Sequence, residues 1–206
     1  MNNYRIAYNQ GWKVLKDRNF NRVSKIRDVK YREDVNIFEI DILGDHYILD
    51  CDSEKIYNTE TLEDMDISLA ITLLNYLGFS DDDTKIENKW VSLKEIPNGG
   101  NLYYPAFYKS SIEPLIKEFG YSSDIFLIIA LGLGGAEYKF GDVSAVFNIF
   151  PRVPICVVIW EGDDEISANA TVLFDSSIQK IMHIESSIGI GMFITKQLKD
   201  LTIYLK

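Results

Sequence analysis

The sequence predicts an α+β fold: a single domain over residues 1–206 in which several helices pack against an antiparallel sheet. Apolar residues recur at helical spacing in residues 4–16 and 67–77, and they alternate with polar ones in residues 35–42. Residues 155–160 are apolar on both faces, as in a strand that is covered on both sides. With 47% apolar and 25% charged residues, a chain of this length can bury an ordinary core without metal or disulfide staples.

Helices are expected where apolar stripes lie between capping residues. Asp66 is a suitable N-cap for residues 67–77, and Gly78 ends that helix. Residues 104–119 favour a helix that is kinked or divided at Pro114, because proline removes a backbone donor. The remaining expected helices cover residues 4–16, 21–28, 125–133, 176–183 and 188–201.

Strands are expected in two groups. Residues 35–42, 46–49 and 56–57 favour a meander, and residues 143–150 and 155–161 favour a hairpin at the centre of the sheet, at about 143–160. If the loop is Pro151–Pro154 and residue 150 pairs with 155, Trp160 lies opposite Ala145 on the buried side. This register also places Phe147 opposite Val158.

The charge balance argues against a nucleic-acid partner. The chain has 21 basic and 31 acidic residues, a net charge of −10, whereas phosphate binding needs a basic face. Residues 13–32 hold eight basic residues against two acidic ones. That run indicates a solvated face or one docked on the chain's own acidic surface; an acidic partner protein is the alternative.

The spacing of the cysteines and the length of the apolar runs limit which cofactors and which cellular compartment are expected. Cys51 and Cys156 are 105 positions apart and outside any metal-ligand spacing, so no zinc or iron–sulfur centre, and no other cofactor, is expected. Residues 1–7 lack the apolar core of a signal peptide. The longest apolar run, residues 125–136, is too short to cross a bilayer, so a cytoplasmic protein without membrane contact is expected.

An acidic corner is the most informative local feature. The predicted register places Asp142 opposite Asp163 and Ser144 opposite Glu161, while Asp164 and Glu165 follow directly. Like charges that face each other across a ladder destabilise a sheet and need compensation. Three interpretations stay open: a solvated turn, a salt-bridged corner, or a hard-metal or acid–base carboxylate site.

Several segments in order resemble an uncharacterised prokaryotic family, domain of unknown function number 3786, over about residues 90–175. They are Trp90–Gly100, Pro114-Leu115 with Phe119-Gly120, Leu133-Gly134-Gly135 before Gly141-Asp142, Pro151-x-x-Pro154, Trp160–Glu165 and Leu173-Phe174-Asp175. The resemblance implies an accessory protein linked to iron–sulfur, anaerobic redox or corrinoid metabolism. Longer members carry cysteine-rich segments, which this chain lacks. The family supplies no catalytic residues to carry over.

Two functional hypotheses follow. The first is a non-enzymatic binding or accessory module with a protein partner; the alternative is a carboxylate-based, divalent-metal-assisted enzyme centred on Asp142, Glu161, Asp163 and Asp175. No catalytic residue and no metal ligand is assigned, and the oligomeric state stays open. The candidate functional surface consists of Asp142, Trp160, Glu161, Asp163, Asp164, Glu165 and Asp175.

Overall fold

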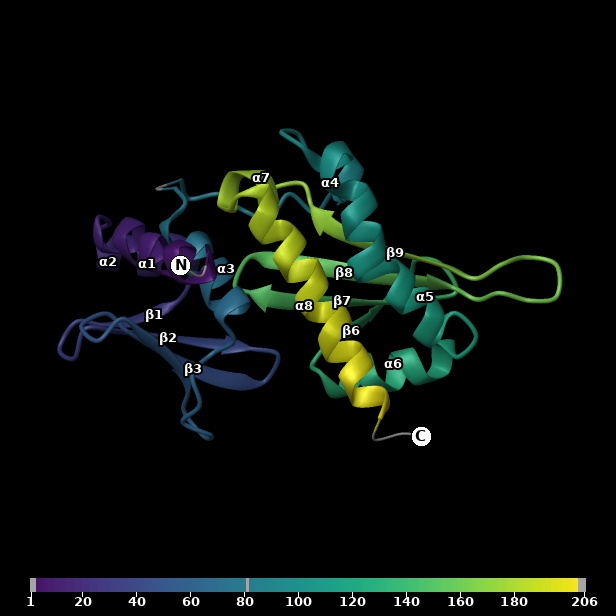
Figure 1. Cartoon of the computed structure of the whole chain (residues 1–206), viewed down its shortest axis with the longest axis horizontal. Coiled ribbons are helices and arrows are strands. Elements are labelled where there is room, and N and C mark those ends of the chain that lie inside the picture. The colour runs from purple at the N-terminus through teal and green to yellow at the C-terminus, as the bar shows by residue number, and fades with distance from the viewer. Residues whose placement is uncertain (1–2, 81, 204–206) are drawn as a thin grey trace.

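The computed structural model describes residues 3–80 and 82–203 and confirms the α+β prediction, with two antiparallel sheets where one was expected (Figure 1). The N-terminal part holds helices α1 (Asn3–Lys16), α2 (Phe20–Arg27) and α3 (Ile67–Gly78). Asp66 caps α3 as predicted, because its carboxylate accepts the Ser68 and Leu69 backbone N–H groups. The first sheet is a meander of four strands in chain order: β1 (Lys30–Arg32), β2 (Ile37–Ile42), β3 (Asp45–Asp50) and β4 (Lys55–Asn58).

The second sheet carries the predicted hairpin. Its strand order is β5-β9-β8-β7-β6, so β8 is the central strand and pairs with β7, which confirms the predicted hairpin pair. Strand β9 fills the other side of β8; the sequence analysis did not predict it. The five strands are β5 (Trp90–Ser92), β6 (Ala136–Tyr138), β7 (Val143–Phe150), β8 (Val153–Trp160) and β9 (Asn169–Asp175).

The register predicted for this hairpin is wrong. The turn contains only Pro151 and Arg152, with φ of 61° at Arg152, and Phe150 pairs with Val153. After an irregularity at residue 149, Val143 pairs with Ile159 and Ala145 with Val157. The prediction was therefore three residues out. Because side chains alternate between faces, an odd slip moves a strand's residues to the opposite face.

Helices cover one face of this sheet. The chain forms α4 (Gly100–Phe107), a π-helical turn η2 (Tyr108–Ile112) and α5 (Glu113–Phe119) in succession. Pro114 lies in the first turn of α5, where its missing N–H costs little, so the predicted division of this helix is confirmed. In Figure 1, α4, α5 and the C-terminal helix α8 (Ile184–Thr202) cross in front of the sheet. Phe107 contacts Phe174 of β9 at 6.0 Å between ring centroids.

Three short helices complete the chain: the 3₁₀ turn η1 (Leu93–Glu95), α6 (Ser123–Gly132) and α7 (Ile178–Ile181). The glycines after α6 end that helix: Gly134 has φ of 79°, and the Gly135 N–H donates to the Ala130 carbonyl at 2.8 Å. No helix in the described ranges is long and apolar enough to cross a membrane.

One hydrophobic core runs through both parts of the molecule. Tyr76 of α3 stacks on Phe150 of β7 with ring centroids 5.0 Å apart. Its buried hydroxyl lies 2.7 Å from the Arg27 carbonyl oxygen and 2.6 Å from the Pro151 carbonyl oxygen, between which it shares its proton. Burial raises the pKa of the Tyr76 hydroxyl, which therefore stays neutral.

The basic run at residues 13–32 contacts the chain's own acceptors at several points. Lys16 pairs with Glu54 at 2.6 Å, and Lys30 pairs with Glu39 at 2.7 Å. Arg18 donates through Nε to the Gly78 carbonyl at the C-terminal end of α3, where a cation complements the helix dipole. These contacts match the interpretation that the run docks on the chain's own surface.

Candidate functional site

The second sheet has two faces of different character. Ala145, Phe147, Ile155, Val157 and Phe174 point toward the helices and belong to the hydrophobic core. Their sequence neighbours on the same strands point the other way. We call this second side the open face. The strand pairing places nine residues on it: Trp90, Tyr138, Ser144, Val146, Cys156, Val158, Trp160, Thr171 and Leu173.

Aromatic side chains gather on the open face. The Trp90 and Tyr138 rings lie 5.9 Å apart between centroids, although β5 and β6 are the two opposite edges of the sheet. Phe140 follows, 4.9 Å from Tyr138. The sheet therefore curls toward this face until its edges meet through their side chains. Tyr138, Phe140 and Trp160 remain 41%, 38% and 38% exposed. We call Trp90, Tyr138, Phe140 and Trp160 the aromatic strip.

Some residues of the open face are themselves buried. Ser144, Cys156 and Val158 are fully buried, yet the two apolar ones are not part of the main core. The Ser144 hydroxyl accepts the Phe140 backbone N–H at 2.9 Å, which holds the turn after β6 over the sheet. Burial raises the pKa of the Cys156 thiol to about 12, so it is a packing group and not a nucleophile.

Trp160 lies at the end of the strip, and its predicted burial against Ala145 is wrong. Position 160 is on the opposite face from Ala145, because of the register described above. A side chain at Gly141 would come within 3.3 Å of the Trp160 indole, so the ring lies against this glycine. Phe147 likewise pairs with Ile155 and not with Val158.

The Trp160→Ala variant is therefore expected to lose only about 1 kcal/mol of unfolding free energy, since the ring remains partly in water. Urea unfolding followed by circular dichroism measures this change. A loss of about 3 kcal/mol or more, the range of buried aromatic truncations, would mean that the indole is a core residue after all.

Asp142 and Glu161 adjoin Trp160 and have structural hydrogen bonds. The Asp142 carboxylate accepts the Glu161 backbone N–H at 2.8 Å. The Glu161 carboxylate accepts the Ser123 backbone N–H at 2.9 Å, at the positive N-terminal end of α6. Asp142 does not face Asp163, and Ser144 pairs with Val158 instead of Glu161, so the predicted ladder of carboxylates is wrong.

Residues 161–168 form the loop between β8 and β9, which we call the acidic loop, and it projects from the body of the protein (Figure 1). Asp163 shapes it: its carboxylate accepts the N–H groups of Glu165 and Ile166 at 2.8 and 2.7 Å. These bonds lower the pKa of the Asp163 carboxyl. Asp164 and Glu165 are exposed.

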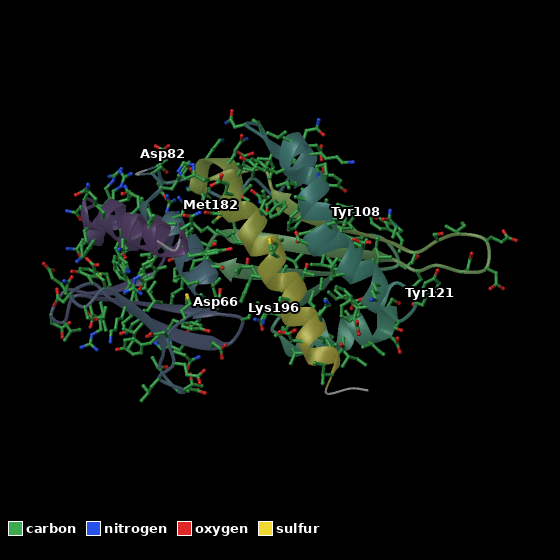
Figure 2. All side chains as sticks on the ribbon, viewed as in Figure 1. Asp66, Asp82, Tyr108, Tyr121, Met182 and Lys196 are labelled. Carbon is green, nitrogen blue, oxygen red and sulfur yellow. The ribbon has the colours of Figure 1, made fainter. Side chains whose placement is uncertain are left out.

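The base of the acidic loop is held by the segment before α6. The Gly162 N–H donates to the Gly120 carbonyl at 2.9 Å. The adjacent Tyr121 ring is so close that a side chain at Gly162 would meet it at 2.7 Å, and Figure 2 shows Tyr121 at the base of the projecting loop. The loop therefore presents its carboxylates from a fixed base.

Asp175 lies at the other end of β9, away from the acidic loop, and is 2% exposed. Its carboxylate accepts the backbone N–H groups of Glu87, Lys89 and Ser177 at 3.0, 3.2 and 3.0 Å, and the Ser177 hydroxyl. Burial acts to raise the pKa of this carboxyl, but the hydrogen bonds outweigh burial and hold it below the ordinary value. Because Lys89 precedes Trp90, Asp175 positions the strand that carries the first ring of the strip.

These carboxylates do not converge on one point. In the described part of the chain, no group of three or more His, Cys, Asp or Glu side chains is arranged to hold a metal ion. Cys51 is buried in the N-terminal half, with its thiol pKa raised to about 12 by burial, so it is no more a thiolate ligand than Cys156.

A groove of about 640 Å³ beside α8 is a second candidate. It lies between α3, the η2 turn and α8; Asp66 and Lys196, labelled in Figure 2, are among its lining residues. Its polar groups bond within the chain: Lys196 pairs with Asp200 at 2.8 Å, and the hydroxyls of Thr72 and Thr195 donate to backbone carbonyls. The aromatic strip, whose rings face water, is the better candidate for binding.

Sequence reasoning found Trp160 and missed the other three rings of the strip. Trp90 stood in a recognised motif, and Tyr138 and Phe140 alternate with charged residues as on a half-exposed strand. That alternation was the available signal. Their meeting depends on the curl of the sheet, because Trp90 and Tyr138 are far apart in the sequence.

The fold and this surface define an α+β protein with an aromatic sheet face beside an acidic loop. The chain belongs to the family described as Domain of unknown function (DUF3786), whose model matches residues 19–197. This match is longer than the stretch of residues 90–175 that carried the resemblance, and it includes the meander, α3 and most of α8. No curated protein and no solved structure matches the chain.

Proposed function

We propose that the protein is a non-enzymatic binding module and that the aromatic strip is its binding surface for a partner protein. The observation that supports this most is the partial exposure of three rings: Tyr138 and Phe140, which contact each other, and Trp160, which lies against Gly141. Large aromatic rings contribute apolar area at low entropic cost, and tryptophan and tyrosine are enriched among the residues that dominate binding energy. Asp142 and the acidic loop, which begins at Glu161, adjoin this surface at Trp160.

The carboxylate geometry favours binding over the alternative of a carboxylate-based, metal-assisted enzyme. An acid–base pair needs two carboxylates that face one reacting group, and a hard cation needs several oxygens around one point. Here Asp142, Glu161 and Asp163 each accept backbone N–H groups, and Asp175 lies at the opposite end of β9.

The setting of this module is part of the same proposal. A place beside anaerobic redox or corrinoid proteins rests on the family resemblance, and a cytoplasmic location rests on the sequence analysis. Within that setting, the aromatic strip would act by docking on another protein.

Peptide display on the immobilised full chain tests the function. Selected peptides are expected to bind the wild type and to bind Tyr138→Ala and Trp160→Ala at least about tenfold more weakly, the loss typical of an interface aromatic. Fluorescence anisotropy with labelled peptides measures the Kd. Leu102→Ala is the matched control, because Leu102 is 79% exposed on α4, which packs on the other side of the sheet.

The proposal fails if the selected peptides lose as much affinity for Leu102→Ala as for the two strip variants. It also fails if no selected peptide responds to the strip variants. Melting temperatures of all three variants accompany the measurement, so that loss of folding is separated from loss of binding.

A further inference from the structure

We infer that the partner presents an arginine-bearing basic segment to the aromatic strip and the acidic loop. This inference rests on the proposed function and names the chemistry of its partner. The segment that carries Tyr138, Phe140 and Trp160 is much more acidic than the chain as a whole.

Residues 136–175, which contain β6 to β9, hold seven acidic and two basic residues. One of the two, Arg152, lies in the turn at the far end of the β7–β8 hairpin and pairs with Asp83 at 2.6 Å. Asp175 is buried at that same end. At the Trp160 end of this segment, Asp142 and the acidic loop border the open face, whereas Glu137 lies opposite Ala145 on the covered side.

The carboxylates near Trp160 keep acceptor capacity for a partner. Asp142 and Glu161 each accept one backbone N–H in the fold, whereas a carboxylate offers about four lone-pair sites. Asp164 and Glu165 are exposed on the projecting loop. A cationic side chain that reaches the Trp160 ring would therefore have the Asp142 carboxylate, which bonds to the adjacent Glu161 backbone, close by.

Arginine can bind both the aromatic rings and the carboxylates of this surface. Its planar guanidinium stacks on tryptophan and tyrosine rings, and its fork of N–H donors binds carboxylates in pairs. Lysine offers a point charge that is more strongly hydrated and cannot form the paired contact. The open face thus favours arginine followed by apolar side chains that rest on Tyr138 and Phe140.

Other occupants fit the charge less well. A second copy of the chain brings a net charge of −10, and a two-fold contact through this face would bring the acidic loops together. A nucleic acid meets the same repulsion.

The test uses three labelled peptides of equal length with alternating Arg–Leu, Lys–Leu and Glu–Leu sequences. The Arg–Leu peptide is expected to bind about fivefold more tightly than the Lys–Leu peptide, and the Glu–Leu peptide not measurably. Raising the salt from about 50 to about 300 mM is expected to weaken Arg–Leu binding by about fivefold. Tyr138→Ala is expected to weaken it as well.

A charge-matched pair of variants separates this surface from general attraction to an acidic protein. The triple variant Asp163→Asn, Asp164→Asn, Glu165→Gln is expected to weaken Arg–Leu binding by about five- to tenfold, for three exposed charge contacts. The loop does not need an anion at position 163, because an amide oxygen can still accept the two backbone bonds. The control Glu60→Gln, Glu63→Gln, Asp64→Asn removes the same charge before α3 and is expected to change the Kd by less than about twofold.

Equal losses in the two triple variants would overturn the inference. So would equal binding of the Lys–Leu peptide, or display peptides that depend on Tyr138 and Trp160 but carry no excess of arginine; in the last case the binding module stands and only the partner chemistry is wrong. If sedimentation shows a dimer that Trp160→Ala dissolves, the strip binds a second copy instead.

Discussion

The Asp175→Ala variant is expected to lose about 3–5 kcal/mol of unfolding free energy, because it leaves one buried and two part-buried backbone donors without this acceptor. In the wild type this carboxylate accepts N–H groups from Glu87, Lys89 and Ser177 at one buried point. The loss should also free the chain before Trp90, so amide hydrogen exchange in residues 87–92 should accelerate more than in β7.

The Asp175→Asn variant is the matched control. Its amide oxygen can still accept two of the N–H groups, but its NH₂ group would face the third, so a smaller loss of about 1–3 kcal/mol is expected. Urea unfolding at neutral pH measures both variants. An alanine variant within about 1 kcal/mol of the wild type would contradict the role given to Asp175, because that is the net value of a single ordinary hydrogen bond.

Acid is expected to remove the stabilisation that the Asp175 carboxylate provides. The folded-state pKa of Asp175 is below the unfolded value, so its stabilisation is fully present above the ordinary aspartate pKa of about 3.9. It declines as the pH falls through the folded-state pKa. The difference in stability between the wild type and Asp175→Asn should therefore be constant from about pH 7 to about pH 5 and shrink below about pH 4.

Phe147→Ala is expected to cost about 3–5 kcal/mol, the usual loss for a buried phenylalanine. Phe147 is 1% exposed on the covered face of β7, where its ring lies against Gly135 and its backbone pairs with Ile155. A neighbouring strand cannot close the cavity, because the sheet ladders fix the distances between strands.

Comparison of Phe147→Ala with Trp160→Ala tests the register of the hairpin directly. The two residues belong to paired strands of one hairpin, yet the smaller ring should contribute several times more stability, because the faces differ. Parallel urea titrations decide the order. If Trp160→Ala is the more destabilising of the two, the hairpin has the register that the sequence suggested and the structure contradicts.

The elements whose signals are local could be predicted from the amino-acid sequence. The helical stripe and the Asp66 cap of α3, the division of the helix at Pro114, and the pairing of residues 143–150 with a doubly apolar strand all follow from neighbouring residues. Composition also indicated a core of ordinary size. Each of these features depends on side chains within about one element of one another, which a pattern of spacing records.

Which faces those elements present depends on contacts that the folded structure alone reveals. A turn of two residues instead of four, together with the irregularity at residue 149, slipped the hairpin by three positions and turned Trp160 away from the core. Strand β9 follows the acidic loop and pairs with β8. The carboxylate of Asp175, the C-terminal residue of β9, accepts the backbone N–H groups of Glu87 and Lys89. The rings of Trp90 and Tyr138 lie close together because the sheet curls. Register, curl and long-range hydrogen bonds arise from contacts between distant residues, and local spacing does not record such contacts.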